Sequence, residues 1–336
     1  MTETSAPYPL FPSAARRKVM AIINPISGTR SKEKLEELLQ QTFRRVQADL
    51  TILHTTGPDD ARTMGRQAAE AGYDLVVAVG GDGTVNEVAS ALCRTRTALG
   101  IIPCGSGNGL ARTLQIPQNF EKSLEILTEG VVENCDYGMV NGIPFFCTFG
   151  LGFDAAVADS FSHCGRRGRL TYIRKAIEEY LRYRPASYAL FINGEVAVKE
   201  AFLIAVCNVS QYGNNVYIAP GASVNDGLLD ITVVRAGSPV DTAMAGLGML
   251  AGSFGPNRTI ESFRVREAVI TRLEPGIVQL DGEPRRMADK LEISCRAGEL
   301  KVMVPKVRHK FRPFITPVQS FFSDMGDDIL HLLSGK

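Results

Sequence analysis

The sequence predicts an α/β fold class in two parts, an N-terminal α/β domain around a parallel sheet and a C-terminal antiparallel β domain. From residue 18 to residue 135, short apolar runs of strand length alternate with apolar residues at helical spacing. From residue 136 to residue 305, strand-like runs follow one another and are separated by turns. The length of 336 residues also exceeds the size at which one hydrophobic core usually stops growing. We therefore expect these two domains, a disordered extension at residues 1–17, and a basic segment with a helix at residues 306–336.

Composition and charge narrow the function classes. Charged residues make up 22% of the chain and the net charge is +1, which argues against a partner that is a polyanion such as nucleic acid. The longest stretch poor in charge, residues 243–254, is shorter than the roughly 20 residues needed to span a bilayer. Residues 1–15 are rich in proline and lack the apolar core of a signal peptide. We expect a cytoplasmic protein that at most contacts a membrane surface.

The cysteines and histidines predict no metal centre or catalytic triad. The 7 cysteines are odd in number, and no pair has the spacing of a metal site. Several lie in apolar runs, so reduced thiols in the core are expected. The 4 histidines are scattered along the chain without a visible acid or nucleophile partner.

The first two predicted strands, at residues 19–23 and 50–54, each end in a loop of small residues followed by a helical pattern. The loop at residues 24–29 contains Ser27, which could offer its hydroxyl to a nucleotide or belong to a simple helix cap. The loop at residues 55–58 ends in a proline, which suits the start of a helix.

The third predicted strand, at residues 75–79, is an unbroken apolar run typical of a parallel strand buried on both faces. It ends in the loop Gly-Gly-Asp-Gly-Thr-Val-Asn-Glu at residues 80–87. Three glycines let the backbone approach a polyphosphate, and the helix that opens at Thr84 points its free N–H groups at the same anion. Asp82 could hold Mg²⁺ or take a proton from an attacking hydroxyl. The alternative is a tight turn in which Asp82 and Thr84 only cap the helix.

The fourth predicted strand, at residues 98–102, again ends in a glycine-rich loop, at residues 103–112. Parallel strands present their carboxyl ends at one edge of a sheet, so the repeated pattern predicts a ligand site at that edge. Neither glycine loop fits Gly-x-Gly-x-x-Gly, because Asn86 and Leu110 stand where the third glycine belongs. No Gly-Lys-Ser/Thr follows the first loop, so Walker and dinucleotide sites are both disfavoured.

The second domain is predicted to be an antiparallel sheet with helical interruptions. Interruptions are expected near residues 155–161, 170–183 and 239–250. The strand-like runs lie at residues 131–140, 145–149, 188–192, 201–208, 229–234, 268–273, 276–280, 291–295 and 300–304.

Two acidic clusters in this domain, residues 226–230 and 281–283, are candidates for chemistry. Asp-Gly between strands is first of all a hairpin turn, and residues 193–195 use the same device with Asn-Gly-Glu. Residues i and i+2 of a strand point to one side, so Asp281 and Glu283 could both face a hydroxyl substrate. Phosphoryl transfer to an alcohol needs a base of this kind.

Two segments are basic, residues 166–184 and residues 306–312. Such runs are usually solvated faces, and the functional alternative is attraction to anionic lipid headgroups, at about 1 kcal/mol per cationic side chain. Residues 317–333 carry apolar side chains at helical spacing, which favours packing on the body of the protein over insertion in lipid.

Taken together, six motifs in a fixed order resemble the diacylglycerol kinase and sphingosine kinase family of lipid kinases. The resemblance extends from about residue 18 to residue 305. It implies an N-terminal domain like that of NAD kinase and phosphofructokinase, a C-terminal β-sandwich, and ATP in a cleft between them. The implied reaction is transfer of the γ-phosphoryl group to a lipid hydroxyl. The motifs are Asn24-Pro25-x-Ser27-Gly28, the loop at residues 80–87, Pro103-x-Gly105-Ser106-Gly107-Asn108, Gly152-Phe153-Asp154, Asp226-Gly227-x-Leu229-Asp230 and Asp281-Gly282-Glu283.

The resemblance also implies roles for single residues. Asp226 looks like the ligand of a magnesium ion seen in bacterial members, with backbone oxygens of Ser223 and Leu228 beside it. Glu283 looks like the proposed proton acceptor, with Asp281 next to it, whereas in sphingosine kinases the residue matching Asp82 is often given that role. Glu283 is preferred here, since Asp82 is better placed to handle phosphate-bound metal. The residues that would hold ATP are Asn24, Ser27, Thr55, Gly80, Gly81, Asp82, Gly83, Thr84, Val85, Asn86 and Ser106.

Two departures from the bacterial pattern leave the acceptor open. Gly109 stands where bacterial diacylglycerol kinases commonly carry Asp, and residues 213–215 replace a more glycine-rich stretch. We expect an ATP- and Mg²⁺-dependent kinase that meets diacylglycerol or a sphingoid base at the membrane surface. A homodimer is compatible with the sequence, which leaves the oligomeric state open. The alternatives are NAD kinase, which shares the Gly-Gly-Asp-Gly loop, and a non-catalytic nucleotide- or lipid-sensing module.

Overall fold

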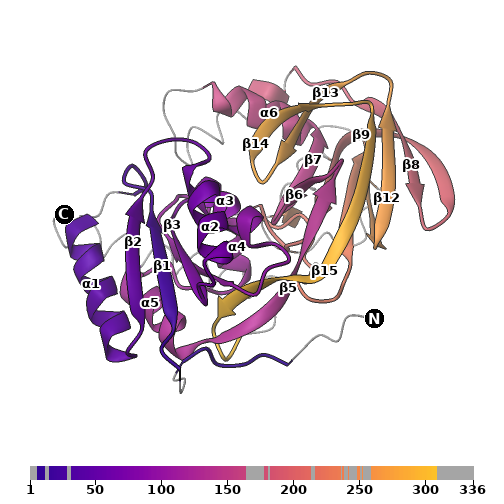
Figure 1. Ribbon diagram of the computed structural model, residues 1–336. Coiled ribbons are helices and arrows are strands. Elements are labelled where there is room, and N and C mark those ends of the chain that lie inside the picture. The colour runs from indigo at the N-terminus through magenta and orange to yellow at the C-terminus, as the bar shows by residue number, and fades with distance from the viewer. Residues whose placement is uncertain are drawn as a thin grey trace. The chain divides into compact units, whose positions relative to one another are not determined.

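The computed structural model describes the chain in two compact units (Figure 1). The first unit comprises the residues up to Cys135 together with residues 298–308, and the second comprises Asp136–Ala297. Among the residues described, no helix is both long enough and apolar enough to cross a membrane. The described residues are 6–11, 15–28, 32–163, 178–180, 182–212, 216–235, 237, 241, 248–249, 252 and 259–308.

The first unit is built on a parallel sheet with strand order β4-β3-β1-β2. Every residue of β3 and β4 is buried, as their unbroken apolar sequences require of central parallel strands. Helices α1 and α5 contact each other, and so do α2 and α3. The predicted alternation of strands and helices is therefore confirmed. Its elements are β1 (Lys18–Ile23), α1 (Lys32–Arg45), β2 (Asp49–His54), α2 (Asp60–Glu70), β3 (Leu75–Gly80), α3 (Asp82–Leu92), β4 (Ala98–Pro103), α4 (Gly109–Thr113) and α5 (Phe120–Glu129).

The second unit is an antiparallel β structure whose strands pair in the order β14-β13-β7-β9-β8-β12-β15. Strand β10 pairs with β9 and β11, and β5 pairs with β6 and β15. The antiparallel prediction is confirmed, and one helix stands where an interruption near residues 155–161 was expected. The elements are β5 (Val131–Val140), β6 (Ile143–Phe145), β7 (Thr148–Gly152), α6 (Phe153–Ser162), β8 (Ala186–Ile192), β9 (Glu195–Cys207), β10 (Leu229–Arg235), β11 (Ile260–Val265), β12 (Glu267–Arg272), β13 (Gly276–Leu280), β14 (Glu283–Met287) and β15 (Lys290–Val304).

Strand β15 differs from the prediction of two separate strands at residues 291–295 and 300–304. It is one continuous strand of 15 residues. The sequence predicts a turn around Gly298, whereas this residue takes a positive φ of 65° within the strand without ending it. The other helices expected near residues 170–183 and 239–250, both basic segments and the C-terminal tail fall largely outside the described residues.

Each unit has its own hydrophobic core. The core of the first unit contains Leu39, Phe43 and Val77, and it also takes in Met303 from the end of β15. The core of the second unit lies between its strands and includes Phe149. The sheet of the first unit therefore provides a rigid edge from which the glycine-rich loops project.

Candidate active site

The carboxyl ends of β1, β3 and β4 bring three of the predicted loops into contact. Asn24, directly after β1, donates from Nδ2 to the Oγ1 of Thr84 in the first turn of α3, which follows β3, at 3.1 Å. A Cβ built on Gly81 would lie 3.3 Å from the Cα of Gly105, which follows β4. The loops that sequence analysis assigned to one sheet edge therefore touch one another there.

Two glycines are sterically required where these loops meet. A Cβ on Gly105 would lie 2.7 Å from the Cα of Gly81. Because the atom it would meet belongs to the backbone, no side-chain rotation could relieve this clash. A Cβ on Gly80 would overlap the side chain of Thr84. The two backbones consequently approach as closely as chains without side chains can.

Asp82 connects the loop after β4 to helix α3. It stands in the first turn of α3, and its two carboxylate oxygens accept the backbone N–H groups of Asn108 and Gly109, both at 2.8 Å. Asn108 is itself buried and accepts the N–H of Gly105 at 3.0 Å. Asp82 thus acts as a brace between two loops, a role that the sequence did not indicate. Its predicted contact with metal or substrate stays a prediction.

The other residues predicted to bind the nucleotide differ in their burial. Thr55 is buried, and its N–H donates to the carbonyl of Ile23 at the end of β1. Ser27 donates its N–H to the carbonyl of Asn24, and Ser106 is exposed. Within α3, Gly83 and Asn86 are half-buried and Val85 is buried.

Glu87, the last residue of the central motif, serves the neighbouring helix. Its carboxylate oxygens accept the N–H groups of Asp59 and Ala61, both at 3.1 Å, at the start of α2. Because the first N–H groups of a helix lack partners within the helix, this contact fixes α2 against α3. The residue was not assigned a role from the sequence, since its partners lie 28 and 26 positions away.

Asp281 and Glu283 have different environments in the hairpin between β13 and β14. The Asp281 carboxylate accepts the N–H groups of Phe146, Cys147 and Thr148, at 2.8, 2.6 and 2.9 Å. The expectation that both carboxylates would present to one substrate assumed strand geometry, whereas Asp281 lies in the turn with a φ of 50°. Its carboxylate holds the 146–148 backbone instead.

Glu283 is exposed at the first position of β14. Within the part of the chain that the structure describes, its carboxylate makes no hydrogen bond and no ion pair. A carboxylate in this state keeps all its lone pairs available to accept a proton from a hydroxyl. Of the two acidic residues in this motif, Glu283 is therefore the better candidate base.

Asp154, in the first turn of α6, is buried in the second unit. Burial raises the pKa of its carboxyl to about 6, and side-chain hydrogen bonds with Gln279 and Tyr212 oppose that rise. Desolvation disfavours the charged form of a carboxyl, which explains the direction of the shift.

This pKa predicts a pH dependence of stability that Asp154→Asn should abolish. Between the ordinary value of 3.8 and about 6, the native state holds a proton that the unfolded chain releases. The stability that this bound proton contributes is thus fully present below the pKa of the unfolded chain. It is lost as pH rises through the pKa of the native state, by about 3 kcal/mol at 1.36 kcal/mol per pKa unit. Denaturant unfolding of both proteins across this range should show the wild-type advantage shrinking with rising pH. A constant difference would contradict the shifted pKa.

The residues predicted to bind magnesium are engaged with one another and with an arginine. One oxygen of Asp226 is paired with the guanidinium of Arg264, and the other accepts the N–H of Leu228 at 3.1 Å. Ser223 donates its hydroxyl to Asn225 at 2.7 Å. The described residues contain no cluster of three or more His, Cys, Asp or Glu side chains that could hold a metal. The predicted site differs from such a cluster, since it consists of one carboxylate and two backbone oxygens, and the assignment of Asp226, Ser223 and Leu228 to magnesium stays a prediction.

Arg264 also faces Asp230, its cross-strand neighbour in the β10–β11 pair, at 3.6 Å between Nε and Oδ1. Burial raises the pKa of Asp230 to about 6, Arg264 opposes the rise and Asp226 adds to it. Arg264 is thus the cation that two carboxylates share.

We expect Arg264→Ala to lower the free energy of unfolding by about 1–3 kcal/mol, because it leaves a buried carboxylate without its cation. Chemical denaturation measures this loss. In the same experiment, adding or chelating Mg²⁺ should leave the wild-type midpoint unchanged. A midpoint that rises with Mg²⁺ would instead support the metal assignment of Asp226.

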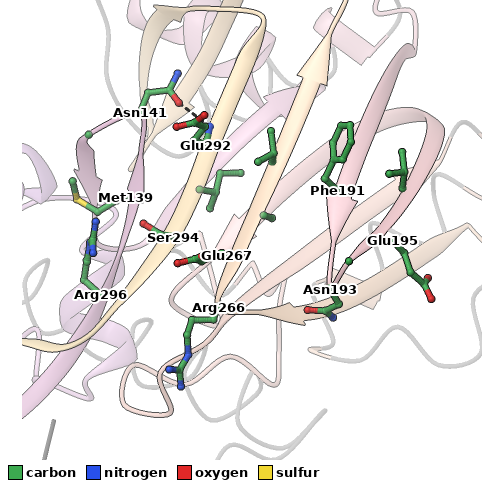
Figure 2. A pocket seen from close by; sticks show the side chains of 16 residues that line it. Met139, Asn141, Phe191, Asn193, Glu195, Arg266, Glu267, Glu292, Ser294 and Arg296 are labelled. Carbon is green, nitrogen blue, oxygen red and sulfur yellow. Dashed lines mark hydrogen bonds between the residues drawn. The ribbon is translucent and has the colours of Figure 1, made fainter. Parts of the chain in front are cut away.

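A separate cavity of about 930 Å³ lies on the second unit, and none of the predicted site residues lines it (Figure 2). Its wall includes the exposed ring of Phe191 together with Arg266 and Glu292. The dashed line in Figure 2 marks the contact between Asn141 and Glu292 that borders the cavity, whose length is 2.7 Å. No sequence pattern predicts this cavity, because its residues come from strands far apart in the chain.

Comparison with known proteins gives two matches to family models. Residues 18–140 match the diacylglycerol kinase catalytic domain, and residues 148–304 match the YegS C-terminal NAD kinase beta sandwich-like domain. The second match identifies the antiparallel unit as a β-sandwich, as predicted.

Individual relatives agree with these models. A diacylglycerol kinase of Mycobacterium tuberculosis (strain H37Rv) is 33% identical over 229 residues, which cover 66% of this chain and 74% of the relative. A Pseudomonas aeruginosa protein named "Probable lipid kinase YegS-like" is 32% identical over 271 residues, or 78% of this chain and 87% of the relative. A crystal structure from Bacillus anthracis, described as a candidate diacylglycerol kinase, superposes with a TM-score of 0.72 at 26% identity and covers 86% of this chain and 97% of its own.

Proposed function

The chain belongs to the diacylglycerol kinase catalytic-domain family, and from this premise we propose that it is an ATP-dependent lipid kinase. The reaction proposed is direct transfer of the γ-phosphoryl group of ATP to a hydroxyl of a lipid. Family membership supports a lipid kinase in general. The co-substrate and the acceptor are the parts that the proposal adds.

The observation that carries the proposal is the contact between the glycine loops after β3 and β4. The side chain of Asp82 braces them, and the close approach of Gly81 and Gly105 leaves no room for a Cβ on Gly105 where the two backbones meet. The first N–H groups of α3 have no partner within the helix and carry its positive end, which favours a phosphate. Backbone cradles of this kind bind polyphosphates without a Walker lysine.

We assign three roles to the chain's own residues in the reaction. The loops after β1, β3 and β4 would position the triphosphate. The exposed carboxylate of Glu283 would accept the proton of the attacking hydroxyl, which raises the nucleophilicity of its oxygen in the transition state. Mg²⁺ would enter with ATP and offset the charge of the phosphates.

The acceptor proposed is diacylglycerol or a sphingoid base, met at a membrane surface. Relatives named diacylglycerol kinase support the first, and Gly109, in the position discussed above, is closer to the sphingosine kinase pattern. Lipid selection depends on the shape of the binding groove, so the choice is an experimental one.

Transfer of labelled γ-phosphate from ATP to a panel of lipids tests the proposal. The panel holds diacylglycerol, sphingoid bases, ceramide and total membrane lipid in mixed micelles, with NAD as a further acceptor. We expect one lipid to be labelled and NAD to remain unlabelled. Labelling of NAD alone would assign the chain as an NAD kinase, and ATP binding without transfer to any acceptor would favour a sensing module.

A further inference from the structure

Resting on the proposed function, we propose that Asp154 and Gln279 are positioning residues, which hold the hairpin that carries Glu283 in its reactive place. Asp154 belongs to the Gly-Phe-Asp motif, to which neither the sequence nor the proposed reaction gives a task. Gln279 lies in β13, two residues before the hairpin turn.

A continuous chain of hydrogen bonds joins Asp154 to the residue next to Glu283. The Nε2 of Gln279 donates to the Oδ2 of Asp154 at 2.9 Å. The Oε1 of the same amide accepts the backbone N–H of Gly282 at 2.7 Å. Both ends of the Gln279 amide are therefore used, and the turn cannot shift without breaking one of the two bonds.

The same amide also ties the hairpin to strand β7. Its Nε2 donates to the hydroxyl of Thr148 at 3.0 Å, and the carbonyl of Thr148 accepts the N–H of Asp281 at 2.8 Å. Asp281 in turn accepts three N–H groups from residues 146–148, as described above. Thus the hairpin is held at both residues of its turn, Asp281 and Gly282, while Glu283 itself makes no such contact.

A glycine, Gly150, leaves the space that this arrangement needs. Gln279 pairs with Gly150 across the β13–β7 ladder. A Cβ on Gly150 would overlap the Asp154 carboxylate and would lie 2.8 Å from the Nε2 of Gln279. A glycine at this position is therefore what allows an acid from α6 to reach a strand residue.

The members of this hydrogen-bond network are buried, so a purely stabilising role would explain them poorly. Gln279 is 1% exposed, Thr148 2% and Asp154 7%. Buried polar and charged groups often stabilise a fold no better than well-packed apolar ones of similar volume. Their benefit here is geometric, because a fully bonded amide fixes the turn in one conformation and with it the base.

A double-mutant cycle between Gln279→Met and Glu283→Gln tests the proposal, with kcat and the KM for ATP measured on the lipid that the wild type labels. We expect Gln279→Met alone to lower kcat by about 10- to 100-fold, the scale of loss for a misplaced catalytic group, and to leave the KM for ATP unchanged. In the Glu283→Gln background the same change should cost less than about 3-fold, since a misplaced base cannot be lost twice.

Losses that multiply in the double variant would overturn the positioning role. If the Gln279→Met variant does not fold, a double variant that carries both Asp154→Asn and Gln279→Glu is tested in its place, so that the acid and the amide exchange positions. Gln279→Glu alone brings two carboxylates together, whereas the exchanged pair restores a donor opposite an acceptor, and we expect it to recover most of kcat. A stable exchanged pair that recovers no kcat would contradict the proposal. A wild-type protein that labels no lipid would overturn the proposed function together with this role.

Discussion

Glu283→Gln should lower kcat for lipid phosphorylation by about 10²- to 10⁴-fold, the usual contribution of a general base. The carboxamide keeps the size of the side chain but cannot accept the hydroxyl proton. ATP binding should be nearly intact, because Glu283 is exposed and is not among the residues assigned to ATP. Single-turnover transfer with a saturating lipid, together with ATP titration, separates the two quantities.

Glu195→Gln provides a matched control. Glu195 is also an exposed glutamate at the start of a strand, and it follows an Asn-Gly turn with φ values of 51° and 82°, close to the 50° and 87° of Asp281 and Gly282. We expect this variant to keep wild-type turnover. If both variants behave alike, or if Glu283→Gln keeps full turnover, Glu283 is not the base.

Asp82→Ala should raise the dissociation constant for ATP by at least about 10-fold and lower kcat/KM by 100-fold or more. Its carboxylate holds two backbone N–H groups of the 105–109 loop, and a hydrogen bond to a charged acceptor contributes about 1.5–3 kcal/mol. Without them the loop must be ordered at the expense of binding energy. Calorimetric titration with ATP and steady-state kinetics give the two values.

Asp74→Ala is the control for this effect. Asp74 precedes the opposite end of β3 and likewise accepts a backbone N–H, from Lys18 at 2.9 Å, as well as pairing with Arg17. Its removal should lower stability and leave the affinity for ATP unchanged. Should Asp82→Ala instead spare ATP binding and reduce kcat alone, the carboxylate acts in the chemical step and the brace is secondary.

The sheet edge and its loops could be predicted because their signals are local. An apolar run such as residues 75–79 dictates burial on both faces, and the glycines that follow dictate a close backbone approach. The division of labour among the acids could not be predicted in this way. Asp281 meets backbone donors 133 to 135 positions away, and Gln279 meets Asp154 at a separation of 125. No periodicity encodes a partner so remote, so the pattern showed that two carboxylates were near one another but not which of them was free.

The same reasoning explains the error at β15. A glycine between two apolar runs is the ordinary sign of a turn, and Gly298 fits that description in the sequence. Its positive φ is accommodated inside one strand because the residues on either side have partners in different parts of the fold, β12 at residues 290–294 and β4 at Val302. Only the tertiary pairing distinguishes such a strand from a hairpin.

Strand β15 also determines when the first unit can finish folding during synthesis on the ribosome. The first unit takes Met303 into its core and pairs Val302 with Leu99 of β4, so it cannot be completed before the second unit has been synthesised. Until residues 298–304 emerge, the nascent N-terminal part exposes an unfilled core and an open sheet edge, which is a surface for chaperones. A gene fragment that stops at residue 135 should consequently yield an incomplete unit, and dividing this kinase into separately expressed halves requires the final strand to be returned to the first.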